Sequence, residues 1–180
     1  MYYNYKEVLN IFKNDYNLKK AIGRKELYKI RPGVYSYEGY TDEYEIIFSK
    51  YKQIVLTLQS AFYHHNITDY IPNYIYLATP KNSYPLNSNH IKQIFMTKKY
   101  FEIGITDVSK NSYRIKVYDL ERTLIELIRY QTKIPYEEYQ HVLKKIRASS
   151  DKLDYKKLIK YAKNFKSYKK IMNTIQNSIM

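Results

Sequence analysis

Residues 18–37 read LKKAIGRKELYKIRPGVYSY, and this stretch decides the fold expected for the N-terminal part of the chain. An apolar-periodic segment ends at Gly23, and a second, basic segment follows it at once. The turn Arg31-Pro32-Gly33 then leads into the β-branched and aromatic residues 34–37. Two adjacent helices, a Pro-Gly turn and a strand are the parts of a winged helix-turn-helix. The stretch therefore predicts a DNA-binding module.

In such a module the second helix enters the major groove, and the hairpin wing rests on the DNA backbone. The buried face of the basic helix would consist of Leu27 and Ile30. The side chains expected to face the groove are Arg24, Lys25, Tyr28 and Lys29. Those expected to hold phosphates, which position the protein without reading bases, are Lys19, Lys20, Arg31 and Tyr35.

Helical spacing of apolar residues predicts the elements that flank this module. A first helix is expected over about 3–14, with Tyr5, Val8, Leu9 and Phe12 in register. Residues 38–40 mark a boundary. Thr41 and Asp42 are then expected to cap a further helix, whose inward residues would be Ile46, Ile47 and Phe48.

The remaining sequence alternates between strand and helix patterns. A buried helix is expected from Ile54 to about Asn66, and the expected strands are 74–79, 91–97, 103–108 and 113–118. Helices are expected after Asp119, Pro135 and Asp154, with a last one marked by Tyr168, Ile171, Ile175 and Ile179; the second of them would turn Tyr136, Tyr139, Leu143 and Ile146 inward. The predicted fold class is α+β, with a winged helix-turn-helix over residues 1–40. A mixed α/β domain with a small sheet and C-terminal helices would follow over 41–180.

The charge of the chain points to a polyanionic partner. The net charge is +14, and residues 36–48 form an acidic connector between two basic regions. Such a balance is typical of proteins that bind nucleic acid. The 24 tyrosines indicate an AT-rich codon bias that also favours lysine, so the placement of the charges carries more weight than their sum. The basic run over 144–170 is equally compatible with a solvated face and with a polyanion surface.

Several kinds of chemistry are not indicated by the sequence. The chain has no cysteine, which removes disulfides and thiolate metal sites and fits a cytoplasmic location. His64 and His65 are adjacent and would point about 100° apart on a helix, so no metal site is expected. With four glycines the chain has no phosphate-cradling loop, and no cofactor is expected. No signal peptide and no membrane span are expected either.

Asp119, Glu121 and Arg122 could form an active-site cluster, but a helix cap with a buried ion pair between the sheet and the helix is the favoured interpretation. A nuclease would need a carboxylate followed two residues later by a lysine on a strand. The only such spacing, Asp154-Tyr155-Lys156, is expected to start a helix. The sequence therefore favours a protein that is not an enzyme.

The order of these motifs resembles that of the AbiEi-type antitoxins of type IV toxin–antitoxin (abortive infection) systems. The matching segments are 29–35 at the turn, 60–72 at the start of the second region, the strand 74–79 and, most specifically, 117–128 with its Tyr-Asp-x-Glu-Arg-Thr order. Together these segments run from about residue 19 to 165. One departure is that the helix-turn-helix has fewer residues before the wing than typical members have.

The resemblance implies a non-enzymatic regulator that represses its own operon by binding promoter DNA at a repeat operator. The C-terminal domain would counter a nucleotidyltransferase-like toxin, with or without a stable complex. The basic surface expected for that role comprises Lys144, Lys145, Arg147, Lys156 and Lys157. Two alternatives stay open: a nucleic-acid-processing enzyme with a divergent nuclease-like second domain, and a basic module that binds an acidic protein or RNA.

Overall fold

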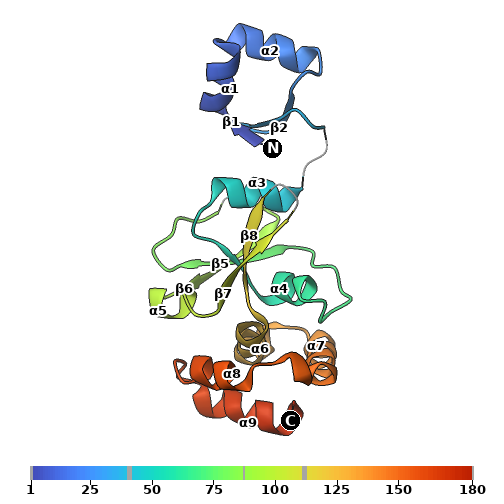
Figure 1. The fold of residues 1–180 in the computed structure, drawn as a ribbon, viewed down its shortest axis with the longest axis vertical. Coiled ribbons are helices and arrows are strands. Elements are labelled where there is room, and N and C mark those ends of the chain that lie inside the picture. Colours follow the sequence, from blue (N-terminus) through green and yellow to red (C-terminus); the bar gives the residue numbers. More distant parts are fainter. Residues whose placement is uncertain (1, 40–41, 87, 111–112, 180) are drawn as a thin grey trace. The chain divides into compact units, whose positions relative to one another are not determined.

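The computed structural model describes residues 2–39, 42–86, 88–110 and 113–179, apart from the side chain of Arg31 (Figure 1). The expected α+β class is confirmed, with a small sheet in each of two units and helices at the C-terminal end. The N-terminal unit combines residues 1–52 with 109–115, and the C-terminal unit combines 53–108 with 116–180. The boundary predicted after residue 40 falls at residues 40 and 41, which lie outside the described part of the chain, as does the predicted cap residue Thr41.

The N-terminal unit is built from short elements around a three-stranded antiparallel sheet with strand order β1-β3-β2. In chain order they are β1 (Tyr2–Asn4), α1 (Tyr5–Phe12), α2 (Asp15–Gly23), β2 (Tyr28–Arg31), β3 (Val34–Ser36) and α3 (Glu43–Lys50). The predicted Pro-Gly turn is confirmed. Gly33 has φ +77°, which suits the third position of a turn that has proline at its second.

The basic helix predicted over residues 24–30 is wrong. Arg24 and Lys25 lie in a turn, Lys25 has φ +59°, and Tyr28 already begins β2. A helix there would have to end before Pro32, because proline disfavours helical backbone in the residue before it. The remaining seven residues are too few for a stable isolated helix. Residues 28–31 instead form backbone hydrogen bonds to β3. The register of this pairing shifts between Lys29 and Arg31 of β2.

The first helix is shorter than the predicted 3–14 because both of its ends are fixed locally. Asn4 and Glu7 form a capping box: the Asn4 side chain accepts from the Glu7 N–H at 3.0 Å, and Glu7 accepts from the Asn4 N–H at 2.7 Å. Lys13 follows the helix with φ +67°, a left-handed conformation that ends it. Asn14 then caps α2 by accepting from the Asn17 N–H at 2.8 Å. Two short helices therefore meet at a two-residue turn.

The C-terminal unit contains most of a mixed sheet with strand order β6-β5-β4-β8-β7; the end of β7 and the start of β8 are counted with the N-terminal unit. Its strands are β4 (Val55–Leu56), β5 (Ile75–Pro80), β6 (Ile91–Met96), β7 (Ile105–Ser109) and β8 (Arg114–Tyr118). The helix predicted from Ile54 is wrong in its first turn, because Val55 and Leu56 form the central strand. They pair antiparallel with β5 and parallel with β8. A short apolar run cannot be assigned to helix or strand by periodicity alone.

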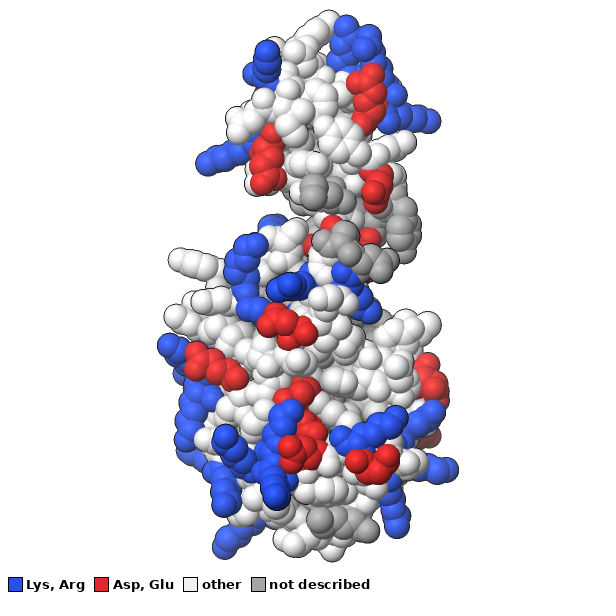
Figure 2. Space-filling view, in the orientation of Figure 1, with Lys and Arg blue, Asp and Glu red and all other residues white. Residues whose placement is uncertain are grey.

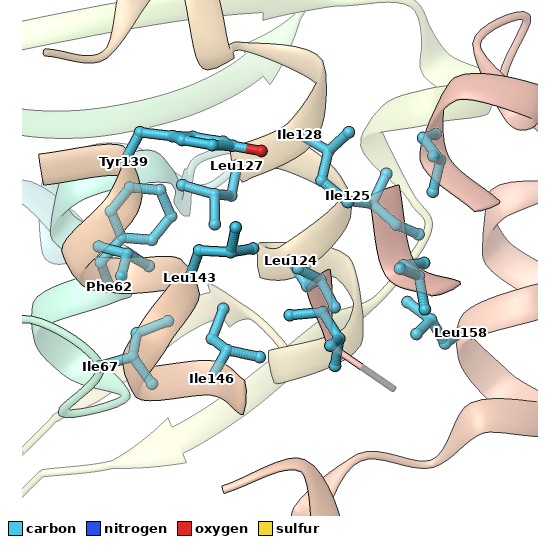
Figure 3. Close-up of a cluster of buried hydrophobic side chains, with 14 of the residues drawn as sticks. Phe62, Ile67, Leu124, Ile125, Leu127, Ile128, Tyr139, Leu143, Ile146 and Leu158 are labelled. Atoms are coloured by element: carbon cyan, nitrogen blue, oxygen red, sulfur yellow. The ribbon is translucent and has the colours of Figure 1, made fainter. Parts of the chain in front are cut away.

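Helices complete the C-terminal unit: α4 (Leu58–His64), α5 (Lys98–Phe101), α6 (Leu120–Arg129), α7 (Tyr136–Ala148), α8 (Tyr155–Ala162) and α9 (Tyr168–Ser178), with 3₁₀ turns at Gln131–Lys133 and Ser150–Lys152. The four helices predicted after residue 118 are confirmed. Figure 3 shows their shared core, in which Leu124 and Leu127 of α6 lie near Leu143 and Ile146 of α7. The prediction that Tyr136 faces inward is wrong, because its side chain is 75% exposed.

Candidate nucleic-acid interface

The helix pair α1–α2 is held by a small apolar core and one polar contact. Val8, Leu18 and Ala21 are buried together with Leu27 and Tyr35. The Tyr5 hydroxyl donates to the Asp15 carboxylate at 2.8 Å, which joins the first residues of the two helices. This hydrogen bond raises the pKa of Tyr5. The apolar core and the Tyr5–Asp15 hydrogen bond together hold the two helices on either side of their turn.

The outer face of α2 is basic and aromatic. Leu18 and Ala21 point into the core, so residues at 16, 19, 20 and 23 lie on the opposite side of the helix. Tyr16 is 73% exposed, and Lys19 and Lys20 are exposed beside it. Gly23 adds no side chain at the end of this face. The structure therefore brings the predicted phosphate contacts Lys19 and Lys20 together with Tyr16, which the sequence reading missed.

The residues predicted to face the groove do not share one surface on a helix. Arg24 follows α2 and lies 3.8 Å from Glu26, and Lys25 is exposed in the same turn. Lys29 is exposed on β2, whereas Tyr28 is half-buried with its ring near Gly39. The basic positions are thus divided between the end of α2 and the hairpin (Figure 2 shows one face of the molecule, with Lys and Arg side chains over this unit).

Tyr35 does not lie where the sequence placed it. It was expected to hold a phosphate, but it is 5% exposed and belongs to the core beneath the hairpin. The alternation of β3 explains this position, because successive side chains of a strand point to opposite faces. Arg31, the other predicted phosphate contact of the turn, ends β2, and its side chain lies outside the described residues.

The basic residues predicted on the C-terminal unit fall into two groups. Lys144, Arg147 and Lys156 are exposed. Lys145 lies 3.1 Å from Asp69 and, as the nearest cation, lowers the pKa of that carboxyl. Lys157 lies 3.0 Å from both Asp119 and Glu121. Burial alone would lower the pKa of Lys157, but its bonds to the two carboxylates outweigh that effect and raise it. Lys157 is therefore a partly exposed member of an ion cluster with Asp119 and Glu121, and is not a free surface charge.

Asp119 and Glu121 serve the start of α6 and its contact with α8. Asp119 accepts from the Arg122 N–H at 2.9 Å and from the Tyr161 hydroxyl at 3.1 Å. Glu121 accepts from the Asp154 N–H at 3.0 Å, which fixes the N-terminal end of α8. The predicted helix cap is confirmed. These contacts, together with Lys157, join α6 to α8 through charge-assisted hydrogen bonds.

Arg122 is one of the buried charged residues of this unit. Its guanidinium is fully buried and lies 2.8 Å from the Glu126 carboxylate, which also pairs with Arg129 at 2.5 Å. It donates to the carbonyls of Tyr100 at 2.7 Å and Ile103 at 3.3 Å. The predicted burial and pairing of Arg122 are confirmed, but the predicted location between the sheet and a helix is wrong, because both partners lie on α6. A fork of five donors is matched here by a carboxylate and two carbonyls.

Gly104 makes room for Arg122, and a side chain there should destabilise the C-terminal unit. The residue has φ +76°, and an added Cβ would lie 2.5 Å from the Arg122 Cβ. Strain and overlap together should lower the free energy of unfolding by about 2–4 kcal/mol in Gly104→Ala. Urea denaturation measures the loss, with Gly23→Ala as a control because nothing lies within 4 Å of its added Cβ. Equal stability of the two variants would contradict the prediction.

Two features of the described residues bear on the chemistry of the chain. Among the residues that the structure describes, no group of three or more His, Cys, Asp or Glu side chains is placed to hold a metal ion. Within the same residues, no helix has the length and apolar character needed to cross a membrane. No protein-family model matches the chain, and no curated protein matches it.

Proposed function

We propose that the protein binds DNA through α2 and the β2–β3 hairpin and represses its own promoter as a winged helix-turn-helix regulator. The observation that carries this proposal is the outer face of α2, where Tyr16, Lys19 and Lys20 stand exposed opposite the buried Leu18 and Ala21. A short amphipathic helix with cations on its free face is suited to the major groove, which admits one α-helix.

The proposed recognition helix is α2, one element earlier in the chain than the sequence suggested. In this arrangement α1 is the supporting helix, and the two-residue turn at Lys13 and Asn14 joins it to α2. Lys19 and Lys20 face the DNA, and Arg24 and Lys25 follow at the end of the helix. Lys29 on the hairpin contacts the phosphate backbone. The hydrogen bond from Tyr5 holds the Asp15 carboxylate toward α1, so this carboxylate repels the phosphates less.

The larger biological role is proposed from the resemblance to AbiEi-type antitoxins. In that role the protein is a non-enzymatic antitoxin, and its C-terminal unit counters a nucleotidyltransferase-like toxin. The exposed Lys144, Arg147 and Lys156 are the candidates for that activity, because Lys145 and Lys157 are already paired with carboxylates. A nucleotidyltransferase-like reading frame next to this gene would support the role, and its absence would count against it.

Binding to the promoter should depend strongly on salt. If about six phosphates are neutralised, the logarithm of the affinity should fall with the logarithm of the salt concentration at a slope of about −5. Fluorescence anisotropy of the full chain with labelled promoter DNA, titrated at several salt concentrations, measures this slope. A scrambled duplex of the same length serves as the control. A flat salt response, or equal affinity for both duplexes, would rule out the repressor.

A further inference from the structure

A cavity of about 510 Å³ lies on the C-terminal unit, between the loop that follows α4, strand β5 and the start of α7. Three tyrosines, Tyr70, Tyr74 and Tyr76, form much of its lining. Gln59 and Glu138 supply polar groups within it. A concave site with aromatic walls and a few convergent polar groups is the usual form of a binding pocket. This cavity is separate from the residues proposed to bind DNA.

The cavity has two polar side chains that contact each other, Gln59 and Glu138. Gln59 is 9% exposed, and its Oε1 has no hydrogen-bond partner among the described residues. Burial raises the pKa of Glu138, and a hydrogen bond from Gln59 opposes that shift without cancelling it. Burial and then the charge of Glu138 raise the pKa of Tyr76. Gln59 Oε1 is shielded from solvent, so the acceptor that a ligand in the cavity can reach is the partly exposed Glu138 carboxylate.

The aromatic walls favour a cation. Tyr70 is 54% exposed and Tyr74 is 38% exposed, so both rings have faces accessible to a ligand. The Lys92 ammonium lies over the Tyr74 ring, 4.3 Å from its centroid, so Tyr70 offers the aromatic surface that is not covered by a lysine. Ring faces attract cations through their quadrupole, and arginine stacks on them more often than lysine does.

The charges of the lining residues favour a cationic ligand over an anionic one. Glu137 and Glu138 line the cavity together with one cation, Lys133, whose ammonium lies 5.5 Å from the Tyr130 ring centroid. The lining is therefore net negative in a chain of net charge +14. A phosphate backbone would be repelled by the two carboxylates, whereas a planar cation with several donors would be attracted to them.

We infer that this cavity binds the guanidinium group of an arginine side chain from a partner polypeptide. The carboxylate of Glu138 accepts its N–H groups, and the tyrosine rings stack on its plane. Ile71, which is 76% exposed, and Tyr136, which is 75% exposed, offer apolar area to the residues on either side of that arginine. The inference does not depend on the proposed DNA binding.

Two blocked pentapeptides test the inference directly. One has a central arginine between leucines, and the other has citrulline, which keeps the shape but lacks the charge. In NMR titrations of the full chain, the arginine peptide should shift the side-chain amide signals of Gln59 saturably, with a Kd on the order of 1 mM. The citrulline peptide should bind at least about tenfold more weakly. Because this contrast uses the unaltered chain, it does not depend on any variant folding.

The variant Glu138→Gln should lower the affinity for the arginine peptide about tenfold. Glu102→Gln is the matched control, since Glu102 lines a different cavity of the same unit. A melting curve of each variant confirms that it is folded. Equal binding of both peptides, shifts confined to other residues, or no saturable shift would overturn the inference. So would a single-stranded oligonucleotide that shifts the Gln59 signals when the arginine peptide does not.

Discussion

Replacing Arg122 with alanine should lower the free energy of unfolding by about 3–5 kcal/mol, which is the cost of breaking a buried ion pair. The guanidinium is fully buried, and its loss leaves the carbonyls of Tyr100 and Ile103 without their donor. The substitution also removes the cation–π contacts of the Arg122 guanidinium, whose Cζ lies 4.5 Å from the Tyr118 ring centroid and 4.7 Å from that of Phe165. Arg129 still pairs with Glu126, which should hold the loss toward the lower end of this range. Equilibrium urea denaturation of the full chain measures it.

Arg122→Lys provides the matched comparison for this prediction. Lysine keeps the charge but cannot reach a carboxylate and two carbonyls with one planar fork, so we expect an intermediate loss of stability. Lys98→Ala, which removes an exposed charge that lies 3.9 Å from Glu102, should leave the free energy of unfolding almost unchanged. If Arg122→Ala unfolds at the same urea concentration as the unaltered chain, the buried pair does not stabilise the fold.

The contacts around Arg122 could be predicted in part because they are local in sequence. Asp119 precedes an apolar stripe, so its role as cap follows from residue type and position. Arg122 lies between Leu120 and Leu124, and Glu126 is one turn further along the same helix. Helical spacing alone places Arg122 and Glu126 side by side. The carbonyls of Tyr100 and Ile103 could not be predicted in this way, because a tertiary contact brings them to the helix.

The two errors in secondary structure arise from strand pairing. Residues 28–31 and 55–56 both contain apolar residues at spacings that a helix would accept. In the structure the first segment pairs with β3, and the second pairs with β5 and β8. These partner strands were predicted, but a local pattern does not show which segments will pair with them. Tertiary pairing of this kind overrides a weak local preference. The capping box of Asn4 and Glu7 was a local signal that would have placed the start of α1.

The candidate DNA-binding residues show the same division. Lys19 and Lys20 could be found because their distance from Leu18 and Ala21 along one helix fixes the face they occupy. Tyr35 was misplaced because the direction of a strand side chain depends on which face of the sheet is covered. Lys157 was misplaced because its partners Asp119 and Glu121 are far away in sequence. Charge alone does not show whether a lysine is free or paired.

Reversing the charge of Lys19 and Lys20 together should weaken promoter binding about a hundredfold. Each reversal replaces an attraction of about 1 kcal/mol at 4 Å in water by a similar repulsion, and salt reduces the total. The slope of log affinity against log salt should also become shallower by about 2, because two phosphate contacts are lost. Both side chains are exposed, so the stability of the chain should change by no more than about 0.5 kcal/mol. Anisotropy titrations with promoter DNA measure both effects.

Lys156→Glu with Lys160→Glu is the matched control, because it reverses two exposed charges on α8 of the C-terminal unit. This variant should bind the promoter within about tenfold of the unaltered chain, because its charges lie outside the proposed contact and are screened by salt. Arg24→Glu with Lys25→Glu should fall between the two, since these residues follow α2 in a turn and Arg24 already lies near Glu26. If α2 is the recognition helix, cells that carry Lys19→Glu with Lys20→Glu should still survive induction of the toxin from a separate promoter. Equal loss of promoter binding in all three folded variants would mean that the affinity for DNA depends only on the total charge of the protein. In that case α2 would have no special role.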